Sequence, residues 1–290
     1  MAAVYAILSA FLYAVANVYT KKGFAHTNIL SAFIISIISC FISSLAICLF
    51  LFSFERYFDR AVWFFIAAGL VGPFLGRALL YEAIDRVGAS VACTVFEAKP
   101  IFSVVIAVLV LEERLSISIL FGVLLMMLGT VIISRESSGG DIVKKWTRRD
   151  LILPLFAGAC YGGSHVLRKI GINLTPEPFM AVMWQNAGAL ICSPFLIWAY
   201  RNNQQVTFHN QKAWFVFGVA GILQVAAQWC LFAALEYGTV VVVSPLTSLS
   251  TLFVLLLAAF LLKKVERITW KIVTGALLII GATVVLTLFP

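Results

Sequence analysis

Long apolar segments alternate with short polar stretches along most of the chain. We identify ten apolar segments of about 20 residues, at residues 3–20, 29–52, 62–83, 89–111, 116–134, 151–170, 178–200, 213–235, 239–262 and 269–289. Each is long enough to cross the hydrocarbon core of a bilayer, which is about 30 Å thick, as an α-helix that rises about 1.5 Å per residue. The pattern predicts an all-α membrane protein with ten transmembrane helices.

The polar stretch at residues 135–150 divides this pattern into two halves, residues 1–134 and 151–290. It contains Ser-Ser-Gly-Gly and Lys-Lys-Trp-Thr-Arg-Arg, which are typical of a solvated linker. The halves share a spaced motif at an offset of 148 residues, which comprises Ala10, Tyr13, Asn17, Lys21 and Gly23 in one and Gly158, Tyr161, His165, Lys169 and Gly171 in the other.

A second motif repeats at an offset of 153 residues. Glu113-Arg114-Leu115-Ser116, followed by Gly122, corresponds to Glu266-Arg267-Ile268-Thr269, followed by Gly275. Because five helices are an odd number, a second copy must enter the membrane from the opposite side. The sequence therefore predicts two inverted five-helix repeats, an arrangement that secondary transporters use to hold substrate near the bilayer midplane.

Composition agrees with a membrane protein and excludes other classes. The chain is 62% hydrophobic and 12% charged, whereas soluble domains are about half apolar and about a quarter charged. The net charge of +8 arises from basic residues spread over short loops, so we do not expect nucleic-acid binding. The six cysteines lie inside apolar segments and form no C-x-x-C pair, so we expect neither a metal site nor a cofactor.

The distribution of basic residues predicts the orientation. Most lie in loops on the side opposite both termini, including Lys144, Lys145, Arg148 and Arg149 of the linker. The positive-inside rule places that side in the cytoplasm. We therefore expect a multi-pass protein of the plasma (cell inner) membrane with both termini on the non-cytoplasmic side, and a first helix that is retained because no basic segment precedes it.

Charged residues in the middle of a predicted span indicate the functional site. Glu97 and Lys99 lie near the centre of 89–111, where a charge is costly and usually functional. On a continuous helix they would point about 200° apart, so we expect each to find a partner elsewhere. Either Glu97 pairs with Arg77 and Lys99 faces the cavity, or the roles are reversed. Pro100 predicts a hinge.

Further candidates are spread over several spans. Arg77 and Tyr81 share a helix face after the Gly72-Pro73 step, and Pro245 is a second predicted hinge. We expect spans three, four, eight and nine to line a cavity. The remaining candidate substrate-binding residues are polar or aromatic residues inside other spans, namely His165, Trp184, Gln185, Asn186, Gln228 and Trp229.

The sequence resembles EamA-type permeases of the drug/metabolite transporter superfamily over almost its whole length. The resemblance rests on Leu-Glu-Glu-Arg-Leu-Ser (111–116), on the spacing from Pro100 to Glu113, and on Gly158-Ala-Cys-Tyr-Gly-Gly-Ser-His165. The second half departs from the pattern, since it has no proline matching Pro100 and carries Lys263-Lys264-Val265 where a small-residue turn is usual. The resemblance implies a transporter fold and leaves the substrate open.

We therefore predict a secondary transporter that moves a small polar metabolite by alternating access. The excess of Arg77 and Lys99 over Glu97 favours an amino acid or an organic acid. The alternatives are a multidrug or sugar-linked anion exporter, or a membrane scaffold. An enzyme is not expected, because the sequence contains no HExxH, no paired aspartate motif and no G-x-S-x-G. The expected partners are the small-molecule substrate and membrane lipid. Coupling of transport to protons and formation of a homodimer are left open.

Overall fold

The computed structural model describes residues 1–23, 27–51, 59–87, 89–137, 147–200, 210–261 and 269–288. All ten predicted segments are helical, to within a few residues at each end. Seven stretches of the described residues are long and apolar enough to cross a membrane, and Ile117–Ile133 is a shorter apolar helix. Most of the predicted linker, Lys263-Lys264-Val265 and Glu266-Arg267-Ile268 lie outside the described residues.

The described residues of the first half form seven α-helices and one π-helical turn. Two long helices come first, and the third and fourth predicted spans are each interrupted. The elements are α1 (Ala2–Gly23), α2 (Ile29–Leu51), α3 (Ala61–Gly69), the π-helical η2 (Leu70–Gly76), α4 (Arg77–Val87), α5 (Ala89–Phe96), α6 (Lys99–Leu111) and α7 (Ile117–Ser137). The π-helical turn contains Gly72 and Pro73, and proline disrupts the regular hydrogen-bond ladder.

The second half begins with a short 3₁₀ turn and has one interrupted span. Its elements are η3 (Arg148–Leu151), α8 (Ile152–Leu174), α9 (Pro178–Tyr200), α10 (Gln211–Tyr237), α11 (Val240–Thr247), α12 (Leu249–Leu261) and α13 (Trp270–Leu288). Thr147 and Asp150 form a capping box that starts η3. Asn210 accepts a hydrogen bond from the backbone of Lys212 and caps α10.

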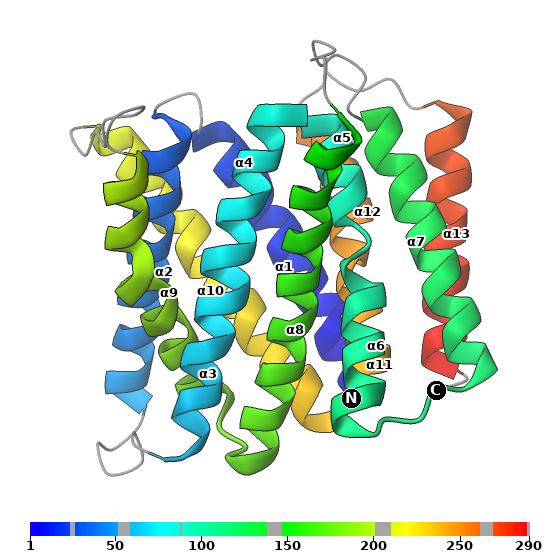
Figure 1. Cartoon of the computed structure of the whole chain (residues 1–290), viewed down its shortest axis with the longest axis horizontal. Coiled ribbons are helices and arrows are strands. Elements are labelled where there is room, and N and C mark those ends of the chain that lie inside the picture. The colour runs from blue at the N-terminus through cyan, green and yellow to red at the C-terminus, as the bar shows by residue number, and fades with distance from the viewer. Residues whose placement is uncertain are drawn as a thin grey trace.

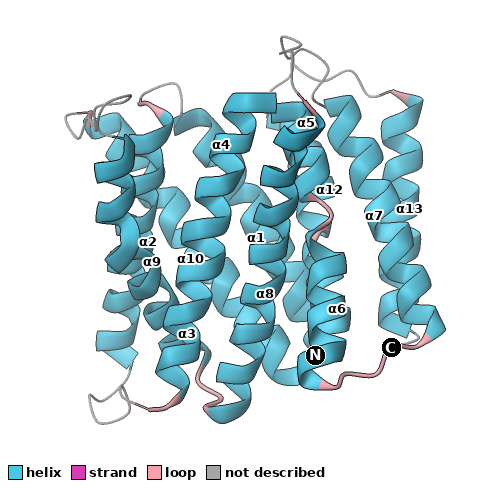
Figure 2. Ribbon diagram, in the orientation of Figure 1, coloured by secondary structure: helices cyan, strands magenta, loops and turns pink. Residues whose placement is uncertain are grey.

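The helices form one bundle with both termini at the same end (Figure 1). The described loops between helices are short, and strands are absent from the described residues (Figure 2). The pair α2 and α9 lies at one edge of the bundle and the pair α7 and α13 at the other (Figure 1). Between them, α1 packs against α10 while α8 packs against α3, η2 and α4.

Large apolar side chains cover much of the outer surface. Trp63, Leu109, Phe215 and Trp270 are all exposed, an arrangement that suits contact with lipid tails rather than with water. Inside the bundle, glycines let helices approach closely: a Cβ atom on Gly69 would collide with the backbone of α9 at Gln185. Tight helix packing thus leaves the interior polar side chains in fixed positions.

Candidate functional site

The helix that carries Glu97 is broken at the charged residues. α5 ends at Phe96 and α6 begins at Lys99, and the backbone turns tightly between them, with Ala98 N–H bonded to the carbonyl of Val95 and Ile101 N–H to that of Ala98. Pro100 cannot donate to the carbonyl of Phe96, so the regular ladder is lost at this point.

The same break occurs in the second half, 150 residues later. Ser248 N–H bonds to the carbonyl of Pro245, and Thr251 N–H bonds to that of Ser248, between α11 and α12. The prolines differ in place, since Pro100 follows its break and Pro245 precedes its own. Both predicted hinge residues therefore lie within one helical turn of a break.

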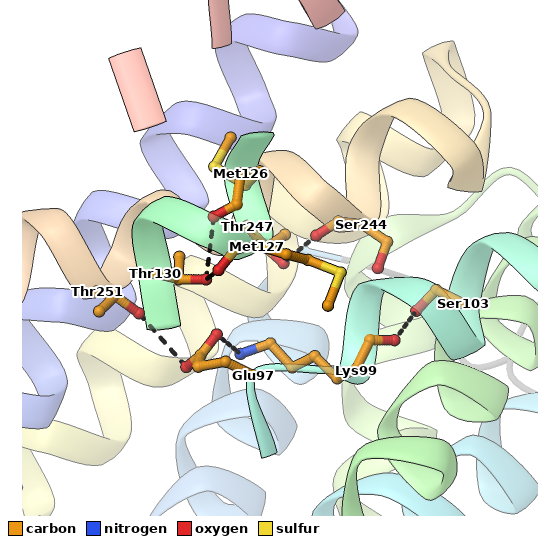
Figure 3. Close-up of polar contacts among 9 residues, drawn as sticks. All are labelled: Glu97, Lys99, Ser103, Met126, Met127, Thr130, Ser244, Thr247 and Thr251. Atoms are coloured by element: carbon orange, nitrogen blue, oxygen red, sulfur yellow. Dashed lines mark hydrogen bonds and ion pairs between the residues drawn. The ribbon is translucent and has the colours of Figure 1, made fainter. Parts of the chain in front are cut away.

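The break corrects the expectation that Glu97 and Lys99 cannot pair. Lys99 Nζ lies 3.4 Å from Glu97 Oε2 and forms an ion pair with it (Figure 3). The expected angular separation of about 200° applies to a continuous helix, and residues 97 and 98 are not helical. The hydroxyl of Thr251, beside the other break, donates to Glu97 Oε1 at 3.4 Å (Figure 3). Glu97 thus connects the broken helices of the two halves.

Both breaks open onto a cavity of about 640 Å³. Six of the predicted substrate-binding residues line it, namely Arg77, Tyr81, Glu97, Lys99, His165 and Gln228. The lining comes from the predicted spans three, four, eight and nine, and also from α1, α2, α7 and α8. This volume is within the range of about 300–1,000 Å³ that is typical of small-molecule sites.

The four other predicted residues are absent from the described lining, because they pack helices together. Asn186 Nδ2 donates to Ser44 Oγ at 3.4 Å and joins α9 to α2. Trp229 stacks on Phe179 with ring centroids 5.0 Å apart. Trp184 packs against the apolar interior, and Gln185 is fully buried. Trp229 directly follows Gln228, so it points about 100° away from the cavity-lining face of α10.

Arg168 is a cavity residue that is not among the site residues predicted from the sequence. It lies in α8, is 3% exposed, and packs over the ring of Phe232 at 5.9 Å. Its Nε has no hydrogen-bond partner among the described residues. Arg77 hydrogen-bonds to Tyr161. Within the described part of the chain, neither arginine forms an ion pair with a carboxylate.

A periodic signal in the sequence could have revealed Arg168. Tyr161, His165 and Arg168 line the cavity from one face of α8, and Tyr13, Asn17 and Thr20 line it from one face of α1. The two sets are related by the offset of 148 residues that defines the repeat. The spaced motif therefore marks the cavity face of both helices, and Arg168 stands where the first half has Thr20.

Three further buried polar atoms on the cavity wall lack partners among the described residues. They are Oγ1 of Thr20, Nδ1 of His165 and Oε1 of Gln228, and the side chains of His165 and Gln228 are about as buried as that of Arg168. Buried polar groups are nearly always hydrogen-bonded in native structures, and exceptions require an explanation. A bound polar ligand is an explanation that fits atoms on the wall of a cavity.

Comparisons with known proteins agree with the membrane fold. A model of the EamA-like transporter family matches residues 1–135 and 149–288. A solved structure described only as "Crystal structure of protein" covers 99% of this chain and 96% of its own, with a TM-score of 0.82 and 15% identity. At that identity the likeness shows the fold alone.

Curated proteins match only a short segment. The small ribosomal subunit protein uS19 of Cereibacter sphaeroides is 39% identical over 44 residues, and so is that of Roseobacter denitrificans; the segment is 15% of this chain and 48% of either protein. The chain thus spans about half the length of the curated relatives it matches, and the segment is too short to assign a family. The family model covers both halves instead, and the chain belongs to the EamA-like transporter family, a group of multi-pass membrane transporters within the drug/metabolite transporter superfamily.

Proposed function

We propose that this protein is a secondary transporter that carries a small organic anion, either an organic acid or an amino acid, across the plasma (cell inner) membrane. The observation that carries the proposal is the pair of arginines on the cavity wall. Arg77 and Arg168 face the same cavity, and no described carboxylate pairs with either. A buried charge is costly unless it is paired, and an arginine can hold a carboxylate in a bidentate fork.

Alternating access between two inverted five-helix repeats is the proposed mechanism, and helix packing supports it. The contact of α1 with α10 has its counterpart in the contact of α8 with α3, η2 and α4, and the contact of α6 with α8 has its counterpart in that of α12 with α1. Paired contacts of this kind are expected if a two-fold axis relates the halves. With α3–η2–α4, α5–α6 and α11–α12 each counted as one span, this arrangement has ten crossings.

Reconstituted vesicles test the proposed function directly. Purified protein in liposomes should exchange a labelled organic acid or amino acid for unlabelled substrate inside, and Arg77→Ala or Lys99→Ala should reduce that exchange. Arg86→Ala is the matched control, because Arg86 is an exposed residue of the same helix as Arg77, paired with Glu82. The site is wrongly assigned if both cavity variants exchange substrate as fast as the control does.

The orientation is part of the same proposal. We place both termini on the non-cytoplasmic side, because the sequence predicts that basic residues such as Lys144, Lys145 and Arg149, between the fifth and sixth spans, lie on the opposite side. A C-terminal reporter that is active only in the cytoplasm should stay silent in cells. Strong activity of that reporter would reverse the orientation without affecting the substrate site.

Coupling to protons is a further element of the proposal, and Glu97 is the group that would carry it. Its carboxylate pairs with Lys99 at a helix break and receives the hydroxyl of Thr251 from the other half, so its charge state is linked to both halves. A transmembrane pH gradient should drive uptake by the wild type and not by Glu97→Gln. Equal acceleration of both by the gradient would remove Glu97 from this role.

A sugar-linked anion exporter is the second candidate, and the size of the cavity favours it. A cavity of about 640 Å³ has room for a ligand larger than a simple amino acid. The same arginines would bind its anionic group. Including a sugar phosphate among the labelled substrates in the exchange assay distinguishes the two candidates.

A further inference from the structure

The charged residues on the described cavity wall are mostly positive. Arg77, Lys99 and Arg168 are cationic, and Glu97 is the one acidic residue in the described lining. Glu97 is paired with Lys99 at the helix break. The two arginines therefore account for the excess positive charge in the described cavity lining.

The arginines lie on neighbouring helices and share a tyrosine. Arg77 begins α4, which packs against α8, the helix that carries Arg168. Tyr161 hydrogen-bonds to Arg77 and also interacts electrostatically with Arg168. Both arginines thus line the same cavity and interact with the phenol group of Tyr161, and no described carboxylate pairs with either.

The region of the wall that the repeat relates to the two arginines, between α1 and α10, has no charged residue in the described lining. By the repeat offset, Thr20 of α1 corresponds to Arg168, and Gln228 of α10 lies near the position that corresponds to Arg77. α1 and α10 pack against each other as α8 and α4 do. Both Thr20 and Gln228 line the cavity. Helix packing in this fold is therefore compatible with neutral residues at both positions, and the two arginines need another explanation.

Electrostatics determines which ligand fits such a pair best. Two cations on the wall of one low-dielectric cavity repel each other, and each is costly to desolvate alone. A ligand with one negative charge neutralises one arginine and leaves the other unpaired. A ligand with two negative charges neutralises both, and carboxylate and phosphate oxygens both match the guanidinium fork.

We infer that the transported substrate is a dianion, either a dicarboxylate or a phosphate monoester, held between Arg77 and Arg168. This inference rests on the proposed function and narrows its substrate class. Nδ1 of His165, which lacks a described partner and lies one turn from Arg168, is a further polar group for the same end of the ligand. Gln228 Oε1 accepts from a hydroxyl or ammonium group at the other end.

Binding to the purified wild-type protein tests the inference with matched ligands that differ by one charge. Succinate is compared with its monoamide succinamate, and glycerol 3-phosphate with its methyl diester, by calorimetry or ligand-induced thermal shift. We expect the preferred dianion to bind at least about tenfold more tightly than its monoanionic partner, a difference of about 1.4 kcal/mol. The two ligand pairs also distinguish a dicarboxylate from a phosphate monoester.

Variants identify the groups that are responsible. Arg168→Gln should reduce the ratio of dianion to monoanion affinity to near one, whereas Arg168→Lys should keep most of it because the charge remains. Arg86→Gln, outside the cavity, should leave the ratio unchanged. If Arg168→Gln fails to fold, Arg77→Gln and Arg168→Lys are used for the test. Arg77→Gln should lose the preference for dianions over monoanions, and Arg168→Lys should retain it.

The inference and the proposed function fail in different ways. Equal binding of succinate and succinamate, together with equal binding of the two phosphates, refutes the inference that the substrate is a dianion. It does not contradict the proposed transport of an organic anion. A preference for dianions that survives both Arg77→Gln and Arg168→Gln overturns the assigned residues. Binding of neutral or cationic ligands in preference to every anion overturns the proposed function as well.

Discussion

Glu113 is expected to be a major stabilising contact between the two halves of the chain. It lies in the connection from α6 to α7, at the end of the bundle where both termini lie (Figure 2). Its two carboxylate oxygens accept the backbone N–H groups of Val240 and Val241, each at 2.9 Å. These are the first residues of α11, and Thr239, the N-cap residue, provides no side-chain cap. Glu113 therefore caps α11 from the other half.

Lys169 holds the turn from α10 to α11 from its other side. Its Nζ donates to the carbonyls of Leu235 and Gly238, at 2.6 and 2.9 Å, where α10 ends. A cation at a helix C-terminus and an anion at a helix N-terminus are both favourable. The turn from α10 to α11 is thus fixed by one acidic and one basic side chain, from the α6–α7 connection and from α8.

The cost of removing the charge of Glu113 can be worked from these contacts. In Glu113→Gln one carboxylate oxygen becomes an NH₂ group, which cannot accept, so one backbone N–H of α11 loses its partner. Losing a hydrogen bond to a charged group costs about 1.5–3 kcal/mol, and the lost charge at the helix N-terminus adds about 0.3–1 kcal/mol. At roughly 2 °C per kcal/mol for a large chain, we expect a fall in Tm of about 4–8 °C.

Thermal unfolding in detergent, followed by circular dichroism, measures this fall. The matched control is Glu112→Gln, which makes the same chemical change one residue earlier, at an exposed position, and should shift Tm by only about 1 °C. Equal shifts in the two variants would refute the capping role of Glu113. In a double-mutant cycle with Lys169→Met, the double variant should lose less stability than the two single variants lose in total, because both side chains hold one turn.

Three further predictions concern packing, pH and the limits of the site. Gly69→Ala should cost about 1–3 kcal/mol in unfolding free energy, because its methyl group would strike the backbone of α9, whereas Gly218→Ala has free space and should not destabilise; Tm measures both. Hydrogen bonding from Thr175, and then from the backbone of Arg60, holds the pKa of Asp59 below its usual value, so its stabilising effect is complete above about pH 4 and disappears as the pH falls through the lowered pKa. Wild type and Asp59→Asn should therefore differ in Tm at pH 7 and converge in strong acid, and a constant difference would contradict this. Asn186→Ala should lower Tm and leave the apparent KM for exchange unchanged, because Asn186 joins α9 to α2. A raised KM at an unchanged Tm would instead identify Asn186 as a substrate-binding residue.

The positions of the helices could be predicted from the sequence because apolar length alone determines them. Segments of about 20 apolar residues satisfy their backbone hydrogen bonds in a bilayer only as helices or as a closed barrel. The prediction was less successful inside the spans. The break at residues 97 and 98 is a local backbone event, and an angular argument that assumed a continuous helix excluded the pairing of Glu97 with Lys99 that the structure contains.

The candidate site could be predicted only in part, for a related reason. Hydropathy identifies which residues lie inside spans but not which direction they face. Asn186 and Gln228 are both amides within apolar helices, yet one joins two helices and the other lines the cavity. Arg168 is not among the predicted site residues although it lies inside the segment 151–170, near its end, and α8 continues past it to Leu174. The direction of a side chain depends on neighbouring helices, which composition does not encode.

The repeat itself carries more information than hydropathy. A duplicated helix presents the same face to the cavity in both copies, so a position known to face the cavity in one half identifies a position in the other. Asn17 corresponds to His165 in this way, and Thr20 corresponds to Arg168. Since the backbone is shared, the residues that differ between equivalent positions are free to serve the substrate. In this chain those differences place positive charge beside α4 and α8 and neutral polar groups beside α1 and α10, so an anionic ligand should bind in one orientation.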